Sequence, residues 1–167
     1  MRILHNPALL LSLAVVLVAC EHKSDARQPD DVRPTPAVRA EVQAAVRKYV
    51  DAYNRADASA IMDLYARGSN ITVVADGEIT RGWESQRAGI DSTIVGHGGG
   101  FRFDVGSVDV VALGKEHALA VAPYTLIATT TQGQLGERGA LTLVLQRSDS
   151  GWVVIHEHES TARPPGH

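Results

Sequence analysis

The C-terminal half of the chain is a succession of long segments rich in β-branched and aliphatic residues, and this feature limits the possible folds most. Gly133 marks a turn between two of these segments, and the run from Ser148 to Gly151 marks another. Strands that follow one another through short turns form a meandering, mostly antiparallel sheet. The sequence predicts strands at 101–110, 116–131, 140–147 and 152–161.

The alternation of apolar residues changes phase inside the first of these strands. The residues up to Val105 and those from Val108 onward are one position out of step. A β-bulge at Gly106 and Ser107 would produce this shift, and bulges bend sheets. Pro123 lies within the next strand and predicts an edge or a bulge there, because proline has no N–H to donate.

The first half of the chain predicts three helices and a hairpin. Thr35 suits a helix cap and Pro36 the first helical turn. Apolar residues then recur at helical spacing from Val38 to Tyr53. The later elements are a short helix capped by Asp57, a hairpin turn at Asp76-Gly77, and a helix from about Gly82 to Val95.

Helices segregated from a meandering sheet define an α+β domain. Leu141, Leu143 and Leu145 alternate with Val144, so the strands are apolar on both faces in places. One face must pack on the helices. The other face must meet something else, such as a second subunit.

The first twenty residues match a bacterial export signal. Arg2 precedes an apolar run, Leu9–Ala19, that is too short to span a membrane and fits the hydrophobic part of a signal peptide. The run ends in Leu17-Val18-Ala19-Cys20, which resembles the lipobox of bacterial lipoproteins. This resemblance implies cleavage before Cys20 and lipid attachment at that residue. The alternative is an ordinary secreted protein with a cysteine there by chance.

The residues after Cys20 predict a tether between the membrane and the folded part. They are charged and proline-rich, and cannot bury enough apolar surface to order themselves. The expected location is the bacterial cell envelope, with the domain in the periplasm or otherwise outside the cytoplasmic membrane; inner and outer membrane are both open. The expected organisation is a signal peptide at 1–19, a lipidated cysteine and tether at 20–36, a folded domain at 37–162 and a disordered tail at 163–167.

Charge and cysteine content argue against nucleic-acid binding and against stabilisation by a disulfide. The formal net charge is −3 and no run of lysine or arginine is present, so nucleic acid is not an expected partner. The chain has one cysteine, so no intramolecular disulfide can form.

The last predicted strand carries the most distinctive side chains. Strict alternation places Trp152, Val154, His156, His158 and Ser160 on one face, and Glu157 and Glu159 on the other. Two histidines on an enclosed wall could shuttle protons, or could simply hydrogen-bond within a partly polar core. No metal is expected, because the spacing supplies no third ligand.

The order of elements, Gly82-Trp83 at the start of the third helix, and the ending GWVVIHEHEST resemble the SnoaL-like division of the nuclear transport factor 2-like superfamily. The similarity covers roughly residues 38–161. It implies a cone-shaped α+β barrel, in which a strongly bent, mostly antiparallel sheet wraps three N-terminal helices around a pocket. It also implies dimerisation through the sheet, and a Trp/His face that looks into the cone.

The resemblance also indicates which side chains line the pocket. His156 and His158 are the best catalytic candidates, while no carboxylate base can be placed, because the directions of Asp104 and Asp109 are unreadable. No cofactor is expected. The ligand-binding candidates are Tyr53, Tyr65, Trp83, Tyr124, Thr142, Trp152, His156 and His158.

Three functions are compatible with these observations. The leading hypothesis is a membrane-tethered domain that binds a small apolar or amphipathic molecule, and it requires a pocket of roughly 300 Å³ or more. The second is an isomerase, cyclase or dehydratase that uses a pocket histidine as acid or base. The third is a dimeric assembly or partner-binding module. The superfamily includes enzymes and members without known activity, so the fold alone does not decide.

Overall fold

A computed structural model describes residues 33–162, apart from residues 69, 97–99 and 131–132. The predicted signal peptide, Cys20, most of the tether and the predicted C-terminal tail lie outside the described residues. Within the described ranges, none of the helices combines the length and apolar character needed to cross a bilayer.

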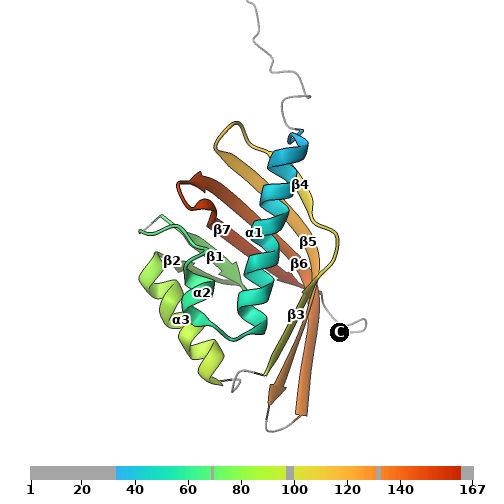
Figure 1. Ribbon diagram of the computed structural model, residues 1–167. Helices are drawn as coiled ribbons and strands as arrows, with labels where there is room; N and C mark the ends of the chain where they lie inside the picture. The colour runs from blue at the N-terminus through green and yellow to red at the C-terminus, as the bar shows by residue number, and fades with distance from the viewer. Residues whose placement is uncertain (1–32, 69, 97–99, 131–132, 163–167) are drawn as a thin grey trace, which may run out of the picture.

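The helices precede most of the strands along the chain, as the sequence predicts, and the predicted α+β class is confirmed. Three helices and a short hairpin precede the long strands (Figure 1). The elements are α1 (Pro36–Asn54), α2 (Ala58–Met62), β1 (Thr72–Ala75), β2 (Glu78–Arg81), α3 (Trp83–Gly96), β3 (Phe101–Val105), β4 (Asp109–Ala112), β5 (His117–Thr130), β6 (Gly133–Ser148) and β7 (Gly151–Thr161).

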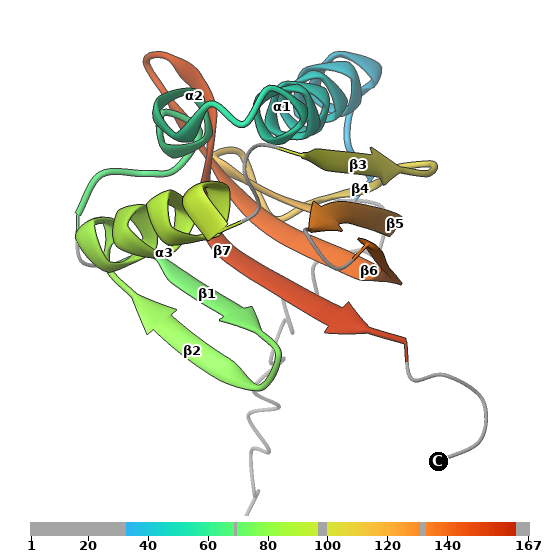
Figure 2. The same ribbon diagram turned by 90° about the horizontal axis from the view of Figure 1, so that it is seen from below.

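The seven strands of the described residues belong to one bent sheet. Its order is β2-β1-β7-β6-β5-β3, and β4 also pairs with β5. Every pairing is antiparallel except that of β1 with β7. The sheet curves around the helices, which all lie on its inner side (Figure 2). This arrangement is the cone predicted from the resemblance.

Local capping fixes the helices where the sequence predicts them. The Thr35 side chain accepts a hydrogen bond from the Val38 amide, with Pro36 in the first turn. Asp57 accepts from the Ala60 amide and starts α2 in the same way. The buried residues of α1 that face the sheet are Val42, Val46, Tyr49 and Ala52.

The predicted phase change near Gly106 is confirmed as a break between β3 and β4, which pair with successive parts of β5. Pro123 lies in β5 opposite this break, between the residues that pair with β3 and those that pair with β4. Its missing N–H therefore costs the sheet no hydrogen bond to either strand. The Gly106 amide donates to the Pro123 carbonyl oxygen at 2.9 Å. The proline therefore marks the bend of the sheet and not its edge.

A β-bulge in β7 overturns the predicted alternation of that strand. Val154 pairs with Leu145 and His156 with Val144, so Ile155 is the extra residue. The bulge moves every later side chain to the opposite face. Trp152 and Val154 face the core before the bulge, and Glu157 faces it after the bulge, whereas His158 is exposed.

Candidate functional site

A cavity of about 470 Å³ lies between the helices and the inner face of the sheet. This volume is in the range of small-molecule sites in proteins. More open hollows of about 400 to 440 Å³ occur elsewhere on the described surface, but none is lined by a buried carboxyl group. The residues that line the cavity include Tyr53, Asp76, Gly89, Phe103, Leu126, Leu135, Glu137, Glu157 and Glu159.

Two carboxyl groups from β7 form the polar floor of the cavity. Glu157 is 2% exposed, and Glu159, two residues further along the same face, is largely buried. The hydroxyl of Tyr49 donates to Oε1 of Glu157 at 2.9 Å, and the hydroxyl of Tyr65 donates to Oε2. The carboxyl group of Glu159 lies near that of Glu157, and the two groups influence each other's pKa.

Burial raises the pKa of both carboxyl groups. For Glu157, hydrogen bonds from Tyr65, Tyr49 and Glu159 oppose the rise, because they favour the ionised form. For Glu159, burial and then the charge of Glu157 raise the pKa to about 8. We therefore assign the negative charge to Glu157 and a proton to Glu159 at neutral pH, so that the pair shares one proton.

A cluster of tyrosines holds the pair in place. The rings of Tyr49 and Tyr53 lie 4.8 Å apart between centroids, and Tyr53 lies 5.6 Å from Phe103. Burial, followed by the charge of Glu157, raises the pKa of Tyr49, Tyr53 and Tyr65 well above 10. These phenols therefore stay protonated and act as hydrogen-bond donors across the physiological range.

Two more carboxyl groups line the cavity. Asp76 is in the turn between β1 and β2, and Glu137 is on β6. The Tyr124 hydroxyl donates to Oε1 of Glu137 at 3.2 Å. Both charges contribute to the raised pKa of Glu159. The wall is thus acidic on several sides.

The two histidines do not line this cavity. His156 and His158 lie on the outer face of the sheet, beyond the bulge, where they pair with Val144 and Thr142 of β6. The prediction that they share a face with Trp152 and Val154 is wrong, because it assumed strict alternation through Ile155. Ser160 likewise lies on the outer face, and is exposed.

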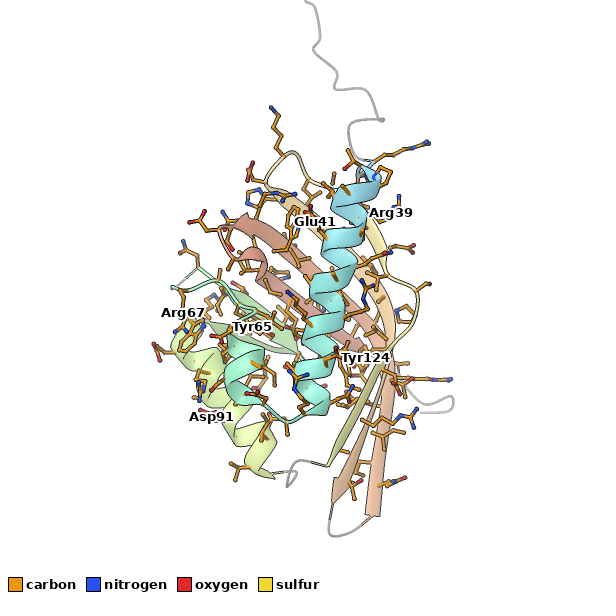
Figure 3. All side chains as sticks on the ribbon, viewed as in Figure 1. Arg39, Glu41, Tyr65, Arg67, Asp91 and Tyr124 are labelled. Atoms are coloured by element: carbon orange, nitrogen blue, oxygen red, sulfur yellow. The ribbon has the colours of Figure 1, made fainter. Side chains whose placement is uncertain are left out.

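The predicted aromatic residues divide into different environments. Tyr53 lines the cavity, and Tyr65, labelled in Figure 3, bonds to its floor. Tyr124, also labelled there, packs behind the wall at 5.7 Å from the Phe103 ring. Trp83 lies outside the cavity lining, and its indole N–H donates to the Met62 carbonyl oxygen at 3.2 Å.

Trp152 has a structural position away from the cavity. Its indole N–H donates to the Glu41 carboxylate at 3.0 Å, and the Arg147 guanidinium lies 4.5 Å from its ring centroid. Arg147 also forms an ion pair with Glu41 at 3.0 Å. These contacts tie α1 to β6 and β7, and none of these residues lines the cavity.

The other candidates lie away from the cavity. Thr142 is on the outer face of β6. Asp104 is exposed and pairs with Arg102 at 2.8 Å, and Asp109 is exposed on β4. Among the residues that the structure describes, no three His, Cys, Asp or Glu side chains are placed to hold a metal.

The residues that form the floor were missed for a specific reason. Strict alternation from Trp152 predicts Glu157 and Glu159 on the outer face. The run Trp152 to Ile155 contains four consecutive apolar residues, which alternation toward a half-polar face does not explain. That run is the one signal in the sequence that the strand changes phase.

The family comparison agrees with this architecture. The family model of the SnoaL-like domain matches residues 42–164. No curated protein is similar enough to the chain to count as a match.

Many solved structures share the fold at low sequence identity. A candidate aromatic ring hydroxylase from Novosphingobium aromaticivorans has a TM-score of 0.72 at 14% identity, covering 79% of this chain and 94% of its own. A candidate dehydratase of the NTF2-like family from Streptomyces avermitilis has a TM-score of 0.69 at 16% identity, covering 78% of this chain and 100% of its own. An NTF2-like superfamily protein from Salmonella enterica serovar Typhimurium has a TM-score of 0.68 at 16% identity, covering 80% of this chain and 96% of its own. At these identities the similarity shows the fold alone.

Proposed function

We propose that this chain, which belongs to the SnoaL-like domain family, is a binding protein for a small molecule with an apolar body. The observation that carries the proposal is the cavity of about 470 Å³ with one polar pair, Glu157 and Glu159, at its floor. Apolar walls with a few convergent polar groups are typical of small-molecule sites. The carboxyl pair would orient the ligand, and Tyr53, Phe103 and Leu126 would contact its body.

Native mass spectrometry of the protein purified from a bacterial envelope tests the proposal. We expect a retained small mass, which Gly89→Phe should remove, because Gly89 lines the cavity and its Cβ direction is open. Gly96→Phe is the matched control on the same helix, since Gly96 is equally open but outside the lining. An adduct that persists in Gly89→Phe would contradict binding in this cavity. The same spectra test the homodimer that we also propose.

We also propose that the domain is tethered to a membrane of the cell envelope through lipid on Cys20. The support is the sequence alone: the apolar run, the lipobox pattern and the single cysteine. Several acyl chains would hold the protein stably where one would not. The charged segment after Cys20 would then act as the spacer.

Cys20→Ser is expected to abolish membrane attachment, because serine offers no thiol for the lipid. The measurement is incorporation of labelled palmitate, together with separation of membrane and soluble fractions. Ser24→Ala, in the same segment, should leave both unchanged. Full labelling of Cys20→Ser would contradict the proposal.

An acid–base enzyme is the second candidate, and one observation favours it. A carboxyl group with a pKa of about 8 in a cavity can give or take a proton near neutral pH. Glu159 replaces the histidines in this role, because neither histidine lines the cavity. If the retained molecule is converted on incubation, Glu159→Gln should stop the conversion while the molecule still binds.

A further inference from the structure

The walls of the cavity carry negative charge without a positive partner. Four carboxyl groups line it, from Asp76, Glu137, Glu157 and Glu159, and no lysine, arginine or histidine does so among the described residues. The ion pairs found among the described residues involve other acids, namely Glu41, Asp63, Asp91 and Asp104.

A buried carboxylate without a cation is costly, even when phenols donate to it. Tyr49 and Tyr65 supply hydrogen bonds to Glu157 but no charge. Burying an ion is unfavourable unless it is paired as well as hydrogen-bonded. A ligand that brings a positive charge would complete this pairing, whereas an anionic ligand would be repelled by the negative charge that Glu157 and the neighbouring acids already carry.

We infer that the cavity takes an organic monocation, an amine or a quaternary ammonium with an apolar body, and holds its charged group against Glu157 and Glu159. This inference rests on the proposed binding function and names its ligand class. The rings of Tyr53 and Phe103 line the same cavity and offer aromatic faces, which attract ammonium groups. Leu126 and Leu135 supply apolar contacts for the body.

A metal ion does not explain the charge equally well. The acids that line the cavity do not gather into a group of three that could ligate one ion, within the part of the chain that the structure describes. An organic cation needs no such convergence, because its charge is spread over a larger volume and its body fills the apolar space.

Cation binding is coupled to the proton that the carboxyl pair shares. An ammonium group beside the pair favours the ionised form of Glu159, so binding releases its proton and strengthens as the pH rises through about 8. The titratable groups that face the pair are Glu137 on β6, Asp76 in the β1–β2 turn, Tyr49 and Tyr53 on α1, Tyr65 after α2, and Tyr124 on β5.

Three probes that differ in charge test the inference. Benzyltrimethylammonium, benzyl alcohol and benzoate are titrated into the full-length chain by calorimetry, with a matched detergent blank. We expect the ammonium to bind at least tenfold more tightly than the alcohol, and benzoate to bind least. Because a quaternary ammonium does not titrate, its Kd should fall at least threefold from pH 6.5 to pH 9 through the protein alone.

Glu159→Gln separates the charge effect from simple occupancy. This variant should keep its affinity for benzyl alcohol and should bind benzyltrimethylammonium about tenfold more weakly at pH 9. Its affinity for benzyltrimethylammonium should no longer depend on pH. Glu116→Gln, an exposed acid before β5, is the control and should behave as the wild type.

The outcomes distinguish the inference from the proposed function. If the alcohol or benzoate binds as tightly as the ammonium, the cation inference is overturned while the binding function stands. If no probe binds at any pH and no adduct is found by mass spectrometry, both are overturned.

Discussion

Raising the pH from 5 to 9 is expected to lower the free energy of unfolding by on the order of 3 kcal/mol, chiefly through Glu159. In the folded protein burial, the charge of Glu157 and the nearby acids raise the pKa of Glu159 from 4.5 to about 8. Below pH 4.5 both states hold the proton, and the stabilising contribution is complete. Between pH 4.5 and 8 only the folded state keeps it, so stability declines as pH rises and the contribution is lost above 8.

Urea unfolding at a series of pH values measures this decline. Glu159→Gln resembles the protonated acid in shape and does not titrate, so its stability should change much less over the same range. Glu116→Gln serves as the control and should retain the wild-type slope, because its side chain is exposed. A wild-type stability that is flat or rises from pH 5 to 9 would show that Glu159 is not held protonated by the fold.

The second large effect is expected at Gly139, where β6 passes close to β7. A Cβ at this position would lie 2.0 Å from the Ser160 carbonyl oxygen and 2.8 Å from Cε1 of Tyr124. Neither neighbour can yield easily, because one is backbone in a paired strand and the other is a buried ring. Gly139→Ala should therefore destabilise the protein by about 3 kcal/mol or more, as overpacking at a rigid contact does.

Gly136→Ala in the same strand is the matched control. The nearest atom to its added Cβ is the Leu126 carbonyl oxygen at 4.0 Å, so no strain is expected. Urea unfolding of both variants at one pH gives the comparison. A Gly139→Ala protein within about 0.5 kcal/mol of the wild type would mean that β6 and β7 can separate here at little cost.

Local chemistry explains which parts of the fold could be predicted from the sequence. The caps at Thr35 and Asp57 and the turn at Asp76-Gly77 depend on residues within a few positions of one another. The break near Gly106 was also visible, because the apolar pattern itself changes phase there. In each case the determining interactions are short-range and leave a mark on the sequence.

The candidate site depends on interactions that leave a weaker mark. Glu157 meets the hydroxyls of Tyr49 and Tyr65 across more than ninety residues of sequence. Its inward direction depends on a bulge at Ile155, a residue whose type does not distinguish it from its neighbours. Tyr53 and Tyr65 could be assigned to the interior from their helical spacing, but not the carboxyl groups that they surround.

The bulge at Ile155 decides which of two sets of side chains in β7 faces the cavity. Glu157 and Glu159 face inward, while His156 and His158 lie on the outer face of the sheet. Loss of Ile155 would remove the bulge, but His156 would still pair with Val144, so Glu157 and Glu159 would stay on the inner face. A strand with the same residues and no bulge would instead alternate strictly from Val154 and would turn His156 and His158 inward. Among proteins of this architecture, matching letters in the last strand therefore need not mean matching chemistry, unless the bulge is also in the same place.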